Sequence, residues 1–247
     1  MVSKKLVMTM ASSSPKKSSK ILNLFRAAVP VLSLDMHKGE CGKIGVIGGS
    51  KEYTGAPYYA AISALKVGAD LAHVFCPPEA AAVIKSYSPE LIVHPILLPA
   101  ESAGTSDKLN MLEWLCRMHA IVLGPGLGRN PDTAATIRWI VTEMKQRKKP
   151  IVIDADGLYF ITEHPEMITG YKQAILTPNV VEFERLHDKL FNVKAESVES
   201  TRLLAERLGH LTIVQKGRHD VITNGKESWL IEGNVQRIMR THTVKHA

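Results

Sequence analysis

Short apolar runs alternate with amphipathic segments along most of the chain. The apolar runs have the length of buried strands, and we predict strands at residues 44–47, 70–76, 91–96, 120–123, 150–153, 174–176 and 211–216. The segments between them predict helices at residues 57–67, 78–86, 107–118, 131–144, 180–190 and 197–208, with short ones at 19–28 and after Gly157. Asn224-Gly225 predicts a hairpin over residues 221–231. This alternation indicates one α/β domain, with a parallel central sheet and helices on both faces.

The sharpest break in the pattern is the stretch Ile121-Val-Leu-Gly-Pro-Gly-Leu-Gly128, a buried strand followed by three glycines and a proline. Glycine lacks a Cβ atom, so such a loop can turn sharply and let a phosphate or sugar approach its backbone N–H groups. Asn130 can cap the next helix, and Pro131 suits its first position. The unit is typical of anion sites in α/β proteins, although a tight turn without a ligand has the same sequence.

Several glycine and polar positions fall at or just past the carboxyl ends of predicted strands. They are Ser50, Gly126, Asp154, Asp156, Asn179, Glu182 and Lys216. In a parallel sheet these ends line one rim, which is where such folds bind substrates. Each residue alone has a structural explanation, such as a helix cap at Asn179 or a solvated Lys216. Their common position predicts an active site at this rim.

Two spacings at the rim indicate chemistry with phosphates. Asn179-x-x-Glu182 places both side chains at a helix start, where a carboxylate can hold Mg²⁺ through water. Lys216-Gly-x-x-Asp220 offers a cation for a phosphate beside a tight turn. Kinase-like chemistry would also need a base to deprotonate the attacking hydroxyl. The turn at Gly48-Gly49 fits neither a dinucleotide fingerprint nor a Walker A loop.

The net charge of +7 comes from the two ends of the chain. Residues 1–34 hold six basic residues and residues 233–247 hold three, with no acid in either segment, so the residues between them carry a net charge of −2. A nucleic-acid-binding protein usually has its basic residues on a folded face, and we therefore expect no nucleic-acid partner. No window is apolar enough for a membrane span, so we expect no membrane partner.

Residues 1–18 are rich in Ser and Lys and predict a disordered basic tail. Organelle transit peptides have a similar composition, so a cytoplasmic and a mitochondrial location both fit. The three cysteines, Cys41, Cys76 and Cys116, are widely spaced and odd in number, which fits a reducing compartment. Cys76 and Cys116 lie in apolar segments, and we expect both in the core.

In combination and in order, the motifs resemble those of the ATP-dependent NAD(P)H-hydrate dehydratases, a family with the ribokinase-like fold. The matching motifs are His37-Lys-Gly39, Gly48-Gly-Ser50 with Tyr53-x-Gly-Ala56, Gly124-Pro-Gly-Leu-Gly128, Val152-Ile-Asp-Ala-Asp-Gly157, Leu176-Thr-Pro-Asn179 with Glu182-Phe183, and Gln215-Lys-Gly217. The resemblance covers about residues 20–232. It implies a three-layer αβα domain over residues 19–232, with a mostly parallel central sheet.

The resemblance implies a repair reaction on damaged nicotinamide nucleotides. In NADH and NADPH hydrates (NADHX and NADPHX), water has added across a double bond of the nicotinamide ring. The family uses ATP to phosphorylate the resulting hydroxyl of the S epimer, and the double bond returns as phosphate leaves. The residues that would contact the hydrate are Gly126, Asn179, Val180, Val181, Glu182, Phe183, Glu184 and Arg185. Those that would contact ATP are Lys216, Gly217, Arg218, His219 and Asp220. Mg²⁺ is the implied cofactor, with Glu182 as its candidate ligand through water.

One family feature has no counterpart in the printed sequence. Members of the family continue after the hairpin into a Gly-x-Gly-Asp segment that supplies an anion hole and the catalytic base. No Gly-x-Gly-Asp follows Gly217, so the catalytic base is unassigned. We expect an incomplete domain with its C-terminal helices truncated, uncovered apolar sheet surface and a divergent tail at residues 233–247. Asp154 and Asp156 lie at the right rim for a base, but the resemblance places no base there.

Two alternative functions stay open. The chain could be a non-catalytic or unstable truncated form that still binds nucleotide, or another small-molecule kinase of the same fold. The pairing of Gly-Pro-Gly-Leu-Gly with Asp-Ala-Asp-Gly argues against the other kinase. A homo-oligomer is compatible with the family, although no interface can be identified from the sequence.

Overall fold

The computed structural model describes residues 8–9, 23, 26–27, 29, 34–195 and 198–232. The helix predicted at residues 19–28 is described only at three positions, and the tail predicted at residues 233–247 lies outside the described residues. Of the basic tail predicted at residues 1–18, only a two-residue strand is described.

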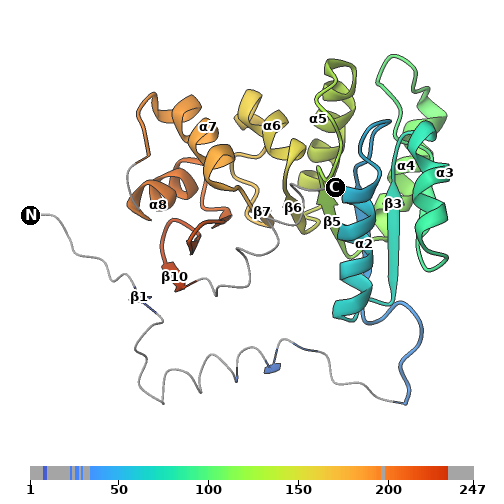
Figure 1. The fold of residues 1–247 in the computed structure, drawn as a ribbon, viewed down its shortest axis with the longest axis horizontal. Helices are drawn as coiled ribbons and strands as arrows, with labels where there is room; N and C mark the ends of the chain where they lie inside the picture. Colours follow the sequence, from blue (N-terminus) through green and yellow to red (C-terminus); the bar gives the residue numbers. More distant parts are fainter. Residues whose placement is uncertain are drawn as a thin grey trace, which may run out of the picture.

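The described strands form one ten-stranded sheet in the order β1-β10-β9-β8-β7-β6-β5-β2-β3-β4 (Figure 1). Their bounds are β1 (Met8–Thr9), β2 (Lys43–Ile47), β3 (Leu71–Phe75), β4 (Ile92–His94), β5 (Ala120–Leu123), β6 (Ile151–Ile153), β7 (Ala174–Leu176), β8 (Thr212–Gln215), β9 (His219–Thr223) and β10 (Ser228–Glu232). The seven strands β2 to β8 pair only in parallel among themselves. Strands β8, β9 and β10 pair antiparallel, and β1 pairs parallel with β10. The predicted parallel sheet and the hairpin at its end are confirmed.

The helices fall where the pattern predicts them, with shifts at their ends. Their bounds are α2 (Gly55–Val67), α3 (Pro78–Tyr87), α4 (Thr105–Arg117), α5 (Pro131–Gln146), α6 (Asp156–Glu163), α7 (Val180–Phe191) and α8 (Val198–Arg207), with a 3-10 turn η2 (Pro165–Met167). Helix α4 begins two residues before the predicted Asp107. The Asp107 carboxylate accepts a hydrogen bond from the N–H of Gly104 at 2.9 Å, which caps the helix from inside its first turn.

The alternation of side chains along the central strands divides the core into two clusters. Val46 and Val74 point to the face covered by α2 and α3. Their neighbours Ile47 and Phe75 point to the opposite face, where α4 to α8 pack. This is the three-layer αβα arrangement that was predicted, with helices on both faces of the sheet (Figure 1).

The layer formed by α2 and α3 covers only part of its face. Register places Val152, Ile175 and Val214 on the same face of β6, β7 and β8 as Val122 of β5. Val122 packs against the α2–α3 cluster, whereas the other three are half-buried and belong to neither core cluster. The described residues thus include apolar sheet surface that is incompletely covered.

The two cysteines expected in the core have different environments. Cys76 is buried, as predicted. The prediction for Cys116 is wrong, because its side chain is exposed. Helix α4 is amphipathic, and Leu115 rather than Cys116 lies on its buried face. An apolar neighbourhood in the sequence does not specify which face of a helix a residue takes.

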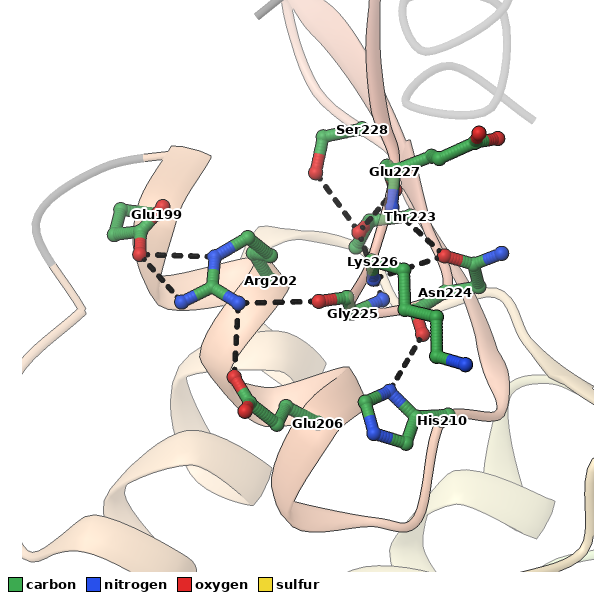
Figure 2. Close-up of polar contacts among 10 residues, drawn as sticks. All are labelled: Glu199, Arg202, Glu206, His210, Thr223, Asn224, Gly225, Lys226, Glu227 and Ser228. Carbon is green, nitrogen blue, oxygen red and sulfur yellow. Dashed lines mark hydrogen bonds and ion pairs between the residues drawn. The ribbon is translucent and has the colours of Figure 1, made fainter. Parts of the chain in front are cut away.

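Helix α8 holds the turn between β9 and β10 (Figure 2). Arg202 donates from Nη1 to the carbonyl oxygen of Gly225 at 3.1 Å. The same guanidinium forms ion pairs with Glu199 and Glu206, each at 2.8 Å, which fix its orientation. One arginine thus joins the helix to the tip of the hairpin.

The turn itself is shaped by Asn224, whose Oδ1 accepts hydrogen bonds from the N–H groups of Lys226 and Glu227 at 3.0 and 2.9 Å. His210, which follows α8, places Nδ1 3.2 Å from the carbonyl oxygen of Asn224 (Figure 2). None of the described helices is long and apolar enough to cross a membrane.

Candidate active site at the carboxyl rim of the sheet

The loops that follow β2, β5, β6 and β7 meet at one rim and are joined by backbone hydrogen bonds. The N–H of Gly124 donates to the carbonyl oxygen of Ile47 at 2.9 Å. The N–H of Asp154 donates to the carbonyl oxygen of Leu123 at 3.1 Å. The N–H of Thr177 donates to Ile153 at 3.1 Å. Each bond extends the parallel ladder past the end of a strand. The predicted convergence of the strand ends is therefore confirmed.

The glycine loop packs directly against the loop after β6. Gly124 has φ +121°, and a Cβ atom there would lie 1.9 Å from the carbonyl oxygen of Asp154 and 2.5 Å from the nitrogen of Gly157. Only glycine allows the two backbones to approach this closely. Gly126 also has a positive φ, and its backbone packs against the carbonyl and Cβ of Tyr53. The glycines of this loop therefore have a structural role, which does not exclude a ligand.

Asp156 ties the turn after β6 to the end of the glycine loop. Its Oδ2 accepts a hydrogen bond from the N–H of Gly128 at 3.0 Å, and its Oδ1 accepts one from Nε of Arg129 at 3.1 Å. The preceding residue, Ala155, has φ +50° and ψ −125°, a conformation that costs a non-glycine residue about 1–3 kcal/mol. Such strain clusters at functional sites. Both carboxylate oxygens of Asp156 are engaged, so the side chain is placed to position the loop.

Lys216 and Asp154 join two strands that are not neighbours. Nζ of Lys216, just after β8, lies 2.7 Å from Oδ1 of Asp154, just after β6, and β7 runs between them. The N–H of Lys216 also donates to the carbonyl oxygen of Pro178 at 2.8 Å. The N–H of Gly217 donates to Oδ1 of Asp220 at 3.0 Å, which closes the tight turn that the sequence predicts.

Asn179 and Glu182 form a capping box at the start of α7. Oδ1 of Asn179 accepts from the N–H of Glu182, and Oε2 of Glu182 accepts from the N–H of Asn179, both at 2.9 Å. The structural explanation for this spacing is therefore confirmed. Oε1 of Glu182 has no hydrogen bond within the described part of the chain. That part also contains no group of three or more His, Cys, Asp or Glu side chains that could hold a metal ion.

An open pocket of about 330 Å³ lies beside the capping box. Its walls include Glu182 and Arg185 of α7, Ala155 and Tyr159 at the start of α6, and Arg129 after the glycine loop. This volume is within the usual range for small-molecule sites. The pocket brings two of the predicted hydrate-binding residues next to the strained turn after β6.

A second pocket of about 380 Å³ connects the two predicted binding segments. Val180 and Phe183 from α7 line it together with His219 from β9. Phe183 is only 2% exposed and packs mainly in the core, whereas Val180 and Val181 are about half exposed. Residues predicted to contact hydrate and ATP therefore lie next to each other. The individual contacts with either ligand stay predictions.

Most residues that line the first pocket are not predicted from the sequence, and Arg129 and Tyr159 are the two that bear most on its chemistry. Arg129 follows the glycine loop directly, and Tyr159 is on the first turn of α6. Nothing in the local sequence distinguishes them from ordinary surface residues. The position of Arg129 between Gly128 and the capping residue Asn130 is the only signal that could have drawn attention to it.

A family model described as NAD(P)H-hydrate dehydratase matches residues 44–238, which is most of the chain and contains the whole of this rim. The chain belongs to the NAD(P)H-hydrate dehydratase family. The family model begins at the second residue of β2 and continues past β10.

Curated relatives named ATP-dependent (S)-NAD(P)H-hydrate dehydratase are similar over most of the chain. The protein from Bos taurus is 50% identical over 217 residues, covering 87% of this chain and 64% of its own length. The protein from Ciona intestinalis is 52% identical over 218 residues, covering 86% and 59%. The human protein is 49% identical over 217 residues, covering 87% and 61%. The chain thus spans about six tenths of the length of these relatives.

Solved structures with the ribokinase-like fold resemble this one. A ribokinase-like superfamily protein from Enterococcus faecalis superposes with a TM-score of 0.70 at 20% identity, covering 86% of this chain and 70% of that one. An ADP/ATP-dependent NAD(P)H-hydrate dehydratase from Bacillus subtilis, co-crystallized with ATP/Mg²⁺, gives 0.59 at 22% identity, covering 85% and 70%. At these identities the likeness shows the fold, and the predicted ribokinase-like fold is confirmed.

Proposed function

We propose that the protein acts in nicotinamide nucleotide repair, by ATP-dependent dehydration of the S epimer of NADH and NADPH hydrates. The observation that carries the proposal is the convergence of motifs. The glycine loop, the Asp-Ala-Asp-Gly turn, the Asn179 capping box and the Lys216 turn are spread over about 90 residues of sequence and meet at one rim. Relatives about 50% identical over this region carry the name of this activity.

In the proposed reaction, the hydroxyl of the hydrated ring loses its proton and attacks the γ-phosphorus of ATP, which breaks the bond to the β,γ-bridging oxygen and releases ADP. The new phosphate ester then leaves the ring as inorganic phosphate, pushed out by the electron pair of the ring nitrogen, and loss of a proton from the neighbouring ring carbon re-forms the C=C bond. The chain binds and orients the two substrates for this transfer. The exposed members of residues 179–185 face the hydrate, whereas Phe183 and Gly126 are buried and contribute to the shape of the site. Lys216 and the turn to Asp220 face the phosphates of ATP, where the ammonium group supplies a positive charge. Because Val180 and His219 line one pocket, the two substrates would meet there.

Mg²⁺ suits this proposal as the metal ion of the reaction with ATP. The relatives are named as ATP-dependent, and the Bacillus subtilis dehydratase was crystallized with ATP/Mg²⁺. Mg²⁺ usually keeps several waters and uses one or two carboxylates together with substrate phosphates. Glu182, with Oε1 unused among the described residues, fits the role of a ligand through water. Such an ion would neutralise charge on the transferring phosphoryl group.

The described residues offer no clear catalytic base. Asp154 is paired with Lys216, and Asp156 holds Gly128 and Arg129. Both contacts favour positioning roles, in agreement with the absence of a base at these positions in the family resemblance. We therefore assign no base among the residues that the structure describes.

A turnover assay tests the proposed function. The purified chain is mixed with NADH hydrate, ATP and Mg²⁺, and the return of nicotinamide absorbance is followed. A second chain, extended with a Gly-x-Gly-Asp segment and the helices that follow it in a relative, is assayed in parallel. Activity in either chain supports the dehydratase proposal. Activity only in the extended chain would identify the 247-residue form as non-catalytic, and silence in both would overturn the proposal.

We propose a cytoplasmic or mitochondrial location on the basis of the basic, serine-rich segment at residues 1–18. Removing these residues from a tagged chain and imaging both forms tests the mitochondrial alternative. A loss of mitochondrial signal would support a transit function, and unchanged cytoplasmic signal would exclude it.

A further inference from the structure

The first rim pocket contains three cationic side chains with different partners. Lys189 lies 4.0 Å from the carboxylate of Glu163, which offsets its charge. Arg129 is bound to Asp156 through Nε alone. Arg185 forms no hydrogen bond or ion pair through its side chain with any described residue. The two arginines therefore keep unused N–H donors at one pocket.

Arg129 is held in a fixed orientation. Its Nε donates to Asp156, and its guanidinium carbon lies 5.0 Å from the centre of the Tyr159 ring. The ion pair and the ring contact fix the plane of the guanidinium group, while Nη1 and Nη2 stay available. The side chain is 52% exposed, so a ligand can reach these two nitrogens. A preoriented guanidinium loses little entropy when it binds an anion.

The carboxylates of the pocket do not occupy these donors. Glu163 faces Lys189, and Glu182 is engaged by the cap of α7. Asp188 of α7 is the remaining carboxylate of the lining, and it forms no ion pair with either arginine among the described residues. The overall charge of the lining is balanced, so an anion would be attracted locally by the two arginines and not by the pocket as a whole.

We propose that Arg129 and Arg185 form a two-arginine clamp for a phosphate group of the dinucleotide substrate. Guanidinium groups bind phosphate oxygens through paired N–H donors, which gives both charge and geometry. The inference rests on the proposed function, because a hydrated nicotinamide dinucleotide carries a pyrophosphate and, in NADPHX, also a 2′-phosphate. The clamp makes Arg129 a specificity-determining residue. It also assigns the pocket beside Tyr159 as the binding site for the substrate's phosphate.

The test uses the whole chain and measures binding, so that it does not depend on catalysis. Arg129→Met removes the charge and keeps most of the unbranched apolar stem, and Arg129→Lys keeps the charge without the planar fork. Arg138→Met is the matched control. Arg138 lies on α5, its side chain is 46% exposed, and its one ion pair within the described part of the chain is with Glu166 of η2, at 3.2 Å. Thermal melting first shows that each variant is folded. Isothermal titration then measures the dissociation constants of NADHX, NADPHX, ADP-ribose and ATP.

We expect Arg129→Met to weaken the binding of the hydrates and ADP-ribose about ten- to a hundredfold, with partial recovery in Arg129→Lys and no change in Arg138→Met. ATP binding should be unaffected. An equal loss for NADHX, NADPHX and ADP-ribose identifies the pyrophosphate as the bound group. A loss confined to NADPHX identifies the 2′-phosphate.

Failure of the clamp can be told from failure of the proposed function. If the wild-type chain binds both hydrates and Arg129→Met binds them equally well, the clamp is overturned and the function stands. If the wild-type chain binds no hydrate but binds ADP-ribose in an Arg129-dependent way, the clamp stands and the substrate assignment fails. A loss of affinity only for ATP, or no binding of any dinucleotide fragment, overturns the clamp.

Discussion

The rim has two halves that are built in different ways. The glycine half consists of residues 124–128 and 154–157, where backbones touch at distances that exclude any Cβ atom. The lysine half consists of residues 216–220 and the β9–β10 hairpin, where side chains make the connections: Lys216 to Asp154, Gly217 to Asp220, and Arg202 to Gly225. Backbone contact cannot adjust without strain, whereas side-chain contacts exchange partners easily. We infer that the glycine half is rigid before a ligand binds and that the lysine half rearranges around one.

The largest effect should come from the glycine half. Gly124→Ala should lower the free energy of unfolding by more than about 4 kcal/mol, because the new methyl group would overlap the carbonyl oxygen of Asp154. Gly68→Ala is the matched control. Gly68 has φ +120°, but nothing lies within 4 Å of its added Cβ. Its cost should be only the conformational strain, about 1–3 kcal/mol. Urea denaturation measures both, and equal costs would show that the contact between the two loops is not tight.

The next effect concerns ligand binding in the lysine half. Lys216→Met should weaken ATP binding about ten- to a hundredfold, because a charge-assisted bond to a phosphate is lost. Its stability should change by less than about 1 kcal/mol, since the ion pair with Asp154 is about one third exposed. Lys226→Met at the exposed tip of the hairpin is the control, and it should change neither the ATP affinity nor the free energy of unfolding. Titration with ATP measures the affinity of each variant. Unchanged affinity in Lys216→Met would show that Lys216 does not contact the triphosphate.

The anchoring of the hairpin should give a smaller effect on stability. Arg202→Met removes the bond to Gly225 and two ion pairs, and we expect a loss of about 1–2 kcal/mol in the free energy of unfolding. Arg138→Met, which breaks one exposed ion pair, should cost less than about 1 kcal/mol. If Arg202→Met also weakens ATP binding, the hairpin positions the lysine half. Unchanged stability would mean that the cluster in Figure 2 contributes nothing.

A pH effect should arise away from both halves and so serve as a reference. His73 on β3 is buried, and its Nδ1 lies 2.9 Å from Nε2 of His94 on β4. Burial lowers the pKa of His94 to about 4, and burial also lowers the pKa of His73. The unfolded chain, whose histidines keep an ordinary pKa near 6.5, binds these protons more readily.

Stability from this pair is therefore fully present above pH about 6.5 and is lost as the pH falls toward 4. Urea midpoints at pH 7.5 and 5.0 measure the loss. In His94→Gln, part of this loss should disappear, because the side chain no longer titrates. Hydrate binding should stay the same in the variant, since β3 and β4 lie at the edge of the sheet, on the far side of β2 from the candidate site. An identical pH dependence in both proteins would exclude His94 as its source.

The features that were predictable from the sequence are local ones. Apolar runs defined β5, β6 and β7, and the Asn179 and Asn130 caps fixed the starts of α7 and α5. The parallel order of strands then implied the rim. The pattern of apolar and polar positions was enough to predict these strands and helix starts, because each depends only on residues a few positions apart.

The features that were not predictable join distant residues. Lys216 and Asp154 are 62 positions apart, and Gly128 and Asp156 are 28 apart. Nothing in the local sequence specifies such pairs, because they depend on the order of strands in the sheet. The role of Arg129 cannot be predicted for the same reason. The prediction for Cys116 is wrong because its apolar neighbours do not specify which face of α4 it takes.

Titration of NADH hydrate into the purified 247-residue chain, without ATP, tests most directly whether the pocket between the glycine half and α7, lined by Ala155 and Arg185, is a formed binding site. The structure predicts saturable binding at one site, weakened in Arg185→Met and unchanged in Lys216→Met. A cooperatively melting chain that binds no hydrate until ATP is added would contradict this. Equal losses in the Arg185 and Lys216 variants would contradict it as well, because the pocket beside the glycine half and the lysine half would then act as a single unit.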